Sequence, residues 1–170
     1  MPMTHLAVLV VAGLACAWDL RTRRIPNVLT FGAAAAALVF HVATDGAGGG
    51  MASIGGWAVG VALLFAPFAL GGMGAGDVKL LGALGAWLGP GDAVWLALYT
   101  GLAGGVMALG LALSHGYLRQ ACRNVWLLFG YWRVAGMRPM AALTLRSGTG
   151  PRLAYAAPIL AGTIVTLWLR

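Results

Sequence analysis

Two of the four acidic residues in the sequence, Asp19 and Asp77, stand where an apolar stretch ends or begins. Carboxylates at membrane depth are costly, so they are usually kept for a function. Two carboxylates that come within a few ångströms of each other cannot both ionise, and they share one proton. The ionised partner can then deprotonate a water while the protonated partner donates to a carbonyl oxygen. This pair therefore predicts general acid–base hydrolysis of a peptide bond.

The residues around Asp77 suit that chemistry. Gly74 and Gly76 have no side chains, so they leave room for an extended substrate backbone, and Lys79 follows on the same segment. Asp77 begins a predicted helix, where the helix dipole favours an anion, whereas Asp19 closes one. The hypothesis is that Asp77 is the ionised partner and Asp19 holds the proton.

Structural roles are the alternative for both residues. Asp77 has the residue type of a helix N-cap. Asp19 has the spacing to pair with Arg23 or Arg24 at the end of a helix. Neither alternative involves catalysis, and both stay open at the level of the sequence.

The remaining polar residues predict no metal or cofactor site. Asp45 and Asp92 lie in Gly-rich stretches and are interpreted as turn residues. The histidines and cysteines show no metal-ligand or disulfide spacing; they are His5, His41, His115, Cys16 and Cys122.

The elements that carry these acids are predicted to be membrane helices. The chain is 61% hydrophobic and only 9% charged, with a mean hydropathy of +0.87. A soluble domain carries about 25% charged residues. Close helix packing is indicated by three small-residue motifs, which are Gly56-x-x-x-Gly60, Gly85-x-x-x-Gly89 and Gly101-x-x-x-Gly105.

The apolar runs predict an all-α membrane protein of one domain, residues 1–170, with six transmembrane helices. The runs cover about 4–18, 27–43, 53–72, 77–89, 92–113 and 152–169. The fourth run is shorter than the ~20 residues of a typical span. If it is re-entrant instead, five spans remain.

Charge favours six spans with the N-terminus periplasmic. Ten of the eleven basic residues then face the cytosol, and Asp19 and Asp77 lie together at the cytosolic membrane edge. Five spans would move the six arginines of 114–152 outside, against the positive-inside rule. The net charge of +7 is therefore interpreted as a sign of membrane orientation, and no nucleic acid is expected as a partner.

The basic loop 114–151 mixes arginines with aromatic residues, as in the segment 123–133. One interpretation is an interfacial helix whose aromatics lie at headgroup level while its arginines meet anionic lipid. The other is a docking surface for the substrate.

Two motifs carry a family resemblance. The segments 19–27, which ends in Ile25-Pro26-Asn27, and 74–85, which begins Gly74-Ala75-Gly76-Asp77, resemble those of the type IV prepilin leader peptidases, polytopic GxGD aspartic proteases. The segment 153–162 is loosely similar to the family's last motif, with Ala154 and Ala156 in place of the expected Pro and Gly. Positions that support the resemblance are Arg24, Pro26, Asn27, Tyr155 and Pro158.

The resemblance implies an enzyme of the bacterial cytoplasmic membrane that removes short basic leaders from prepilins, with Asp19 and Asp77 as its catalytic pair. It implies prepilins, membrane lipid and pilus assembly machinery as partners, and no cofactor. Larger members also methylate the new N-terminus and carry paired Cys-x-x-Cys motifs. This chain lacks those motifs and is most similar to the compact Tad/Flp-type members, so methylation is not expected.

Two other functions stay open. The chain has the composition of a small transporter or a pilus or secretion assembly subunit that uses Asp19 and Asp77 as proton or cation sites. Against transport, the sequence has no internal inverted repeat, and both acids are predicted on one side of the membrane. A GxGD protease with other transmembrane substrates is the second alternative.

Overall fold

Every element in the described part of the chain is a helix. The computed structural model describes residues 3–138, 140 and 153–170. Its helices are α1 (Met3–Thr22), α2 (Asn27–Ala69), α3 (Ala75–Leu88), α4 (Pro90–Ser114), α5 (Leu118–Ala135) and α6 (Ala156–Leu169). The predicted all-α class is confirmed. Part of the predicted loop 114–151 forms α5, whereas residues 139 and 141–151, with Arg146, lie outside the described residues, as does position 152.

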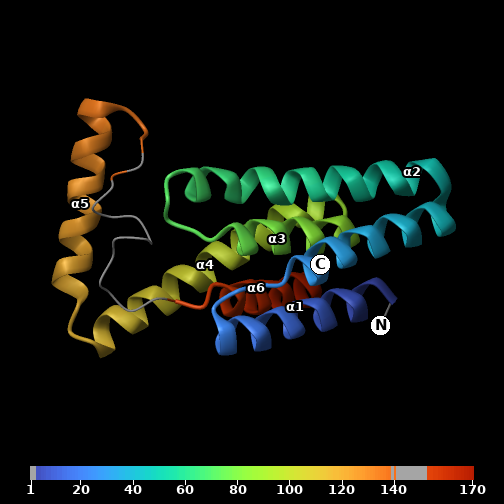
Figure 1. Cartoon of the computed structure of the whole chain (residues 1–170), viewed down its shortest axis with the longest axis horizontal. Helices are drawn as coiled ribbons and strands as arrows, with labels where there is room; N and C mark the ends of the chain where they lie inside the picture. The colour runs from blue at the N-terminus through green and yellow to red at the C-terminus, as the bar shows by residue number, and fades with distance from the viewer. Residues whose placement is uncertain (1–2, 139, 141–152) are drawn as a thin grey trace.

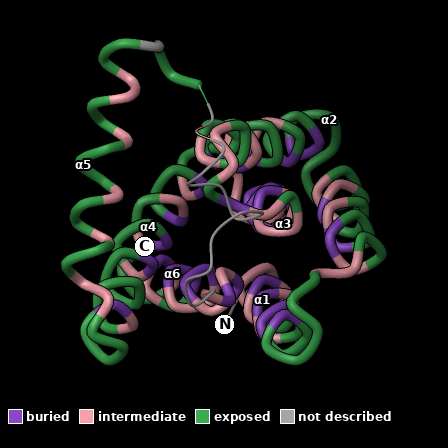
Figure 2. Tube along the Cα trace, turned by 60° about the vertical axis from the view of Figure 1, so that its left-hand side comes forward, coloured by how far each residue is buried: buried purple, intermediate pink, exposed green. Residues whose placement is uncertain are grey.

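The short helix α3 is the centre of the bundle. It packs against α2, α4 and α1, while α6 packs between α4 and α1 (Figures 1 and 2). Its residues from Leu80 to Ala86 are all buried. A helix of 14 residues is about 21 Å long, less than the ~30 Å of a bilayer core. Because its residues are buried by α1, α2 and α4, α3 is surrounded by neighbouring helices along most of its length.

Among the described residues, three helices are long and apolar enough to cross a membrane, namely α1, α2 and α4, and α6 is a shorter apolar helix. The helix α2 contains two antiparallel limbs, because it folds back on itself at Gly46 (Figure 1). It thus joins the predicted segments 27–43 and 53–72. Gly46 has φ 63°, a conformation that costs glycine little. Close contact of the limbs also needs Gly49, whose Cβ would collide with the His41 carbonyl.

Glycines bring the second limb of α2 against α3. A Cβ on Gly56 would strike the Gly85 carbonyl, and a Cβ on Gly85 would strike that of Gly56. A Cβ on Gly60 would lie 2.7 Å from the Leu81 carbonyl oxygen. The predicted small-residue contact is therefore confirmed for Gly56 and Gly60. By contrast, a Cβ on Gly101 would meet nothing within 4 Å.

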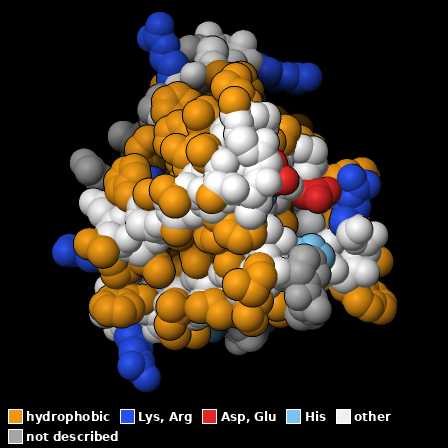
Figure 3. Space-filling model, turned by 90° about the vertical axis from the view of Figure 1, so that its right-hand side faces the viewer, with side chains coloured by type: hydrophobic (Ala, Val, Ile, Leu, Met, Phe, Trp, Pro, Cys, Tyr) orange, Lys and Arg blue, Asp and Glu red, His pale blue; other side chains and the backbone are white. Residues whose placement is uncertain are grey.

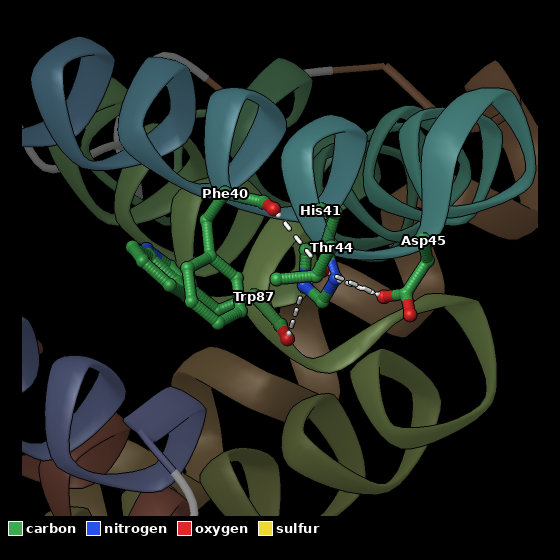
Figure 4. A network of polar contacts seen from close by, with 5 residues as sticks. All are labelled: Phe40, His41, Thr44, Asp45 and Trp87. Atoms are coloured by element: carbon green, nitrogen blue, oxygen red, sulfur yellow. Dashed lines mark hydrogen bonds and ion pairs between the residues drawn. The ribbon is translucent and has the colours of Figure 1, made fainter.

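A polar network ties the C-terminus of α3 to α2 at the Gly46 end. His41 Nε2 lies 3.1 Å from the Trp87 carbonyl oxygen (Figure 4). Trp87 Nε1 donates to the Ala33 carbonyl at 3.0 Å. Because a carbonyl only accepts, His41 Nε2 carries the proton. His41 Nδ1 lies 3.6 Å from Asp45 Oδ2, and that oxygen accepts a hydrogen bond from Thr44 Oγ1. The network satisfies a carbonyl near the end of α3 that the helix leaves open.

Asp45 and Asp92 have partners at this end of the molecule. Asp92, in the first turn of α4, accepts from Arg170 Nε at 3.1 Å, and the Arg170 guanidinium lies over the Trp95 ring. Figure 3 shows the face of the molecule at this end. It is largely hydrophobic, and its few acidic side chains lie near basic side chains and a histidine. Asp45 directly precedes the reversal at Gly46, as expected of a turn residue, whereas Asp92 lies in the first turn of α4 rather than in a loop.

The glycine contacts predict a difference between two similar motifs. Gly56→Val should destabilise the protein by about 1–3 kcal/mol, because the new side chain enters a backbone contact with α3. Gly101→Val, on an open surface of α4, should change stability little. Thermal unfolding of the purified protein in detergent checks this, and equal melting temperatures for the two variants would contradict it.

Candidate active site

Asp19 is buried in the last turn of α1. Its side chain is 7% exposed, and its Oδ2 accepts a hydrogen bond from the Ala156 backbone N–H at 3.4 Å. Ala156 is the first residue of α6, so the positive end of that helix faces the carboxylate. Within the described residues Asp19 forms no ion pair with Arg24. The hypothesis that Asp19 holds the proton rests on its place at the C-terminal end of α1, where the helix dipole disfavours an anion. The N-terminal end of α6 favours an anion at the same carboxylate.

Asp77 is the third residue of α3 rather than its N-cap. The N-cap is Gly74, whose backbone N–H donates to the Asp77 carboxylate. This hydrogen bond between a side chain in the first turn and the N-cap amide is one half of a capping box. Asp77 is half-buried and therefore keeps access to a substrate or water.

The two carboxylates are neighbours across the contact between α1 and α3. The charge of Asp19 acts on Asp77, and the two helices pack against each other. Both acids lie at the end of the bundle that holds the α1–α2 and α2–α3 connections (Figure 1). Asp45 and Asp92 each lie beside a basic side chain.

Tyr155 reaches the same site from the start of α6. It is the N-cap residue of that helix, and the Asp77 charge acts on its phenol. Its ring lies over Gly104 of α4, where a Cβ would meet the Tyr155 hydroxyl at 2.9 Å. The phenol is therefore a hydrogen-bond donor held near the pair of carboxylates.

The glycines of the second motif serve internal packing. A Cβ on Gly76 would lie 3.3 Å from Ile25 Cβ, and one on Gly74 would lie 3.0 Å from Asp77 Oδ2. The side chains of Ile25 and Asp77 thus lie beside these glycines, and these contacts bring the α1–α2 connection and the Asp77 carboxylate close to the start of α3. The approach of a substrate backbone at Gly74 and Gly76 stays a prediction.

Lys79 points away from Asp77. The two residues are two positions apart on α3 and so lie on nearly opposite faces. Lys79 Nζ donates to Asn27 Oδ1 at 3.0 Å and lies 5.1 Å from the centre of the Phe31 ring. Lys79 and Asn27 therefore join α3 to α2. The role of Lys79 in the approach of a substrate backbone stays a prediction.

The other motif positions shape the helix ends. Pro26 is the N-cap of α2, and Pro158 is buried in the first turn of α6, where a missing N–H costs little. Arg24 is exposed, and its carbonyl accepts from Thr22 Oγ1. None of these three has a described contact with either carboxylate.

Two features of the site have no signal in the sequence. One is the Ala156 amide, since any residue except proline supplies a backbone N–H. The other is Gly104, which leaves room for Tyr155 but is one glycine among 27. Cys16, one turn before Asp19, is buried next to it. The described residues contain no group of three or more His, Cys, Asp or Glu side chains placed to hold a metal.

Comparisons with known proteins give one match. The model of the type IV leader peptidase family matches residues 6–109, a range that contains Asp19, Asp77 and the contacts between their helices. Comparisons with curated proteins and with solved structures gave no match.

The packing of Ile25 on Gly76 predicts an energetic coupling between the two motifs. Gly76→Val should destabilise the protein because its side chain displaces Ile25, and Ile25→Ala should recover part of that loss by making room. A double-mutant cycle on thermal or chemical unfolding in detergent should give a coupling of about 0.5–3 kcal/mol. Additive effects of the two substitutions would contradict the contact.

Proposed function

The chain belongs to the type IV leader peptidase family, and we propose that it cleaves the leader from type IV or Flp-type prepilins with Asp19 and Asp77 as its catalytic pair. Membership makes the chain a peptidase of the aspartic type. The observation that carries the proposal is the placement of these two acids on the packed helices α1 and α3, where the charge of Asp19 acts on Asp77.

The two carboxylates act through one shared proton. The ionised carboxylate removes a proton from a water, and the oxygen of that water attacks the scissile carbonyl carbon. The protonated carboxylate donates to the carbonyl oxygen, so the charge that develops there is neutralised as the tetrahedral intermediate forms. The carboxylic acid of the pair then donates its proton to the leaving amine while the other carboxylate takes a proton from a hydroxyl of the tetrahedral intermediate. The C–N bond breaks, a carboxylic acid forms at the new C-terminus, and the pair again holds one proton.

Backbone groups of the protein support each half of the pair. The Ala156 N–H donates to Asp19, and the Gly74 N–H donates to Asp77. Each amide orients its carboxylate and stabilises the negative charge wherever it resides. The Tyr155 phenol, near Asp77, is a second donor for an oxygen of the substrate.

The position of the pair suits a substrate that is polar on one side of the cleaved bond and apolar on the other. Asp19 lies in the last turn of an apolar helix and Asp77 in the first turn of another. We place these turns at the cytosolic edge of the bacterial inner membrane. A prepilin, with its basic leader and the hydrophobic helix that follows, presents its cleavage site at that depth.

The two limbs of α2 support a path of six membrane crossings: α1, each limb of α2, α3, α4 and α6. Basic residues then gather on the side of Asp19 and Asp77, which the positive-inside rule assigns to the cytosol. Both chain termini are periplasmic in this arrangement.

Loss of either carboxylate should abolish processing. Asp19→Asn and Asp77→Asn should each reduce cleavage by about 10²–10⁴-fold, because an amide neither accepts the proton of the water nor returns one. Co-expression with a candidate prepilin, followed by separation of the precursor from the mature form, measures this.

The chain offers matched controls for that experiment. Asp45→Asn and Asp92→Asn make the same chemical change in acids at the other end of the bundle, and both should leave processing near the wild-type level. Wild-type processing by the Asp19 and Asp77 variants would refute the catalytic pair. An equal loss in all four variants would show a general effect on folding and would also count against it.

The membrane path has its own test. Alkaline phosphatase folds only where its disulfides form, in the periplasm. A fusion after Arg170 should therefore be active, and a fusion after Gly116 inactive. The reverse pattern would contradict the orientation, and activity in both fusions would contradict the number of crossings.

A further inference from the structure

The helix α5 lies where the apolar surface of the bundle ends. The apolar sequence of α4 continues to Leu113, and after a short connection with Gly116 at φ 64° the chain enters α5 at Leu118. The axis of α5 runs crosswise to the bundle helices, at the end that holds the α1–α2 and α2–α3 connections (Figure 1). If the bundle helices cross a bilayer, α5 lies along its surface.

Four exposed residues of α5 form an apolar stripe along one face, and Arg133 follows on the same face one turn after Phe129. Cys122, Val125, Trp126 and Phe129 follow the i, i+3, i+4, i+7 spacing of a single helix face, and all four are exposed. We call these four residues the α5 stripe. Trp126 is 78% exposed and Phe129 is 59% exposed. Among the described elements, α5 packs mainly against α4, so no described helix covers the stripe.

The surroundings of the stripe are basic. The helix carries Arg119, Arg123 and Arg133 and no acidic residue. Arg119 and Arg123 line a polar hollow of about 600 Å³ together with Gly116 and Gln120. Exposed aromatic residues flanked by arginines match the boundary between acyl chains and anionic headgroups.

We propose that α5 is an interfacial helix that binds the surface of an anionic bilayer, in the leaflet nearest Asp19 and Asp77. The α5 stripe inserts between the acyl chains, and Arg119 and Arg123 bind lipid phosphates. Three observations favour lipid over a protein partner: the crosswise direction, the start of α5 at the end of the apolar α4, and the excess of positive charge. This inference does not depend on the proposed reaction, and it sets the depth at which the two carboxylates meet the membrane.

The native cysteines permit a direct depth measurement. Cys122 is an exposed member of the stripe, whereas Cys16 is buried. In the full-length Cys16→Ala protein, a nitroxide attached to Cys122 reports its collisions with oxygen, which concentrates in acyl chains, and with a water-soluble nickel chelate. The vesicles contain phosphatidylcholine with phosphatidylglycerol.

A matched control moves the label to another face of the same helix. Gln120→Cys, combined with Cys16→Ala and Cys122→Ala, places the label on the polar side, because residues two apart lie on nearly opposite faces. The Cys122 label should collide more with oxygen and the position-120 label more with nickel. Equal nickel access at both positions would overturn the proposal, and so would shielding of the Cys122 label from both reagents, as beneath a protein surface.

The role of charge is tested by Arg119→Gln combined with Arg123→Gln. Each arginine near an anionic surface should favour the bound state by about fivefold, so the double variant should shift the Cys122 label towards nickel access. Replacing phosphatidylglycerol with phosphatidylcholine should produce the same shift in the unsubstituted helix. A label position that responds to neither change would overturn the part assigned to the arginines.

Discussion

The main constraint on the structure is that two carboxylates, Asp19 and Asp77, lie close enough for the charge of one to act on the other. Mutual repulsion and loss of hydration oppose the meeting of Asp19 and Asp77, so other interactions must hold their helices together. The burial of α3 among α1, α2 and α4 supplies these interactions, and the amides of Ala156 and Gly74 give each carboxylate a donor. Most of the bundle can thus be understood as a support that keeps α1, α3 and α6 in place.

That support depends on residues without side chains. The backbones of α2 and α3 touch at Gly56 and Gly85, and the limbs of α2 meet at Gly49. In a membrane, helices gain little from burying apolar side chains, so close backbone packing and hydrogen bonds account for more of their association. This constraint accounts for those of the 27 glycines that lie at such contacts, such as Gly49, Gly56 and Gly85.

The sequence was sufficient to single out Asp19 and Asp77 as a candidate pair because the chain has only four acidic residues, and because these two lie where an apolar run ends or begins. It also predicted the helical class and the break at Gly89-Pro90, where α3 ends and α4 begins. It did not predict that Lys79 lies across α3 on Asn27, because spacing along a chain does not say which neighbour a helix face will meet. The Ala156 amide was missed for a similar reason, since every residue type except proline carries one.

The coupling of the two carboxylates can be measured without a substrate. The chain has only four aspartates and no glutamate, so ¹³C labelling of the aspartate side chains should give four carboxyl resonances, assigned by the four Asp→Asn variants. If Asp19 and Asp77 share a proton, their resonances titrate together, and substituting either one shifts the titration of the other. If Asp77→Asn leaves the titration of Asp19 unchanged, the two carboxylates do not form a pair.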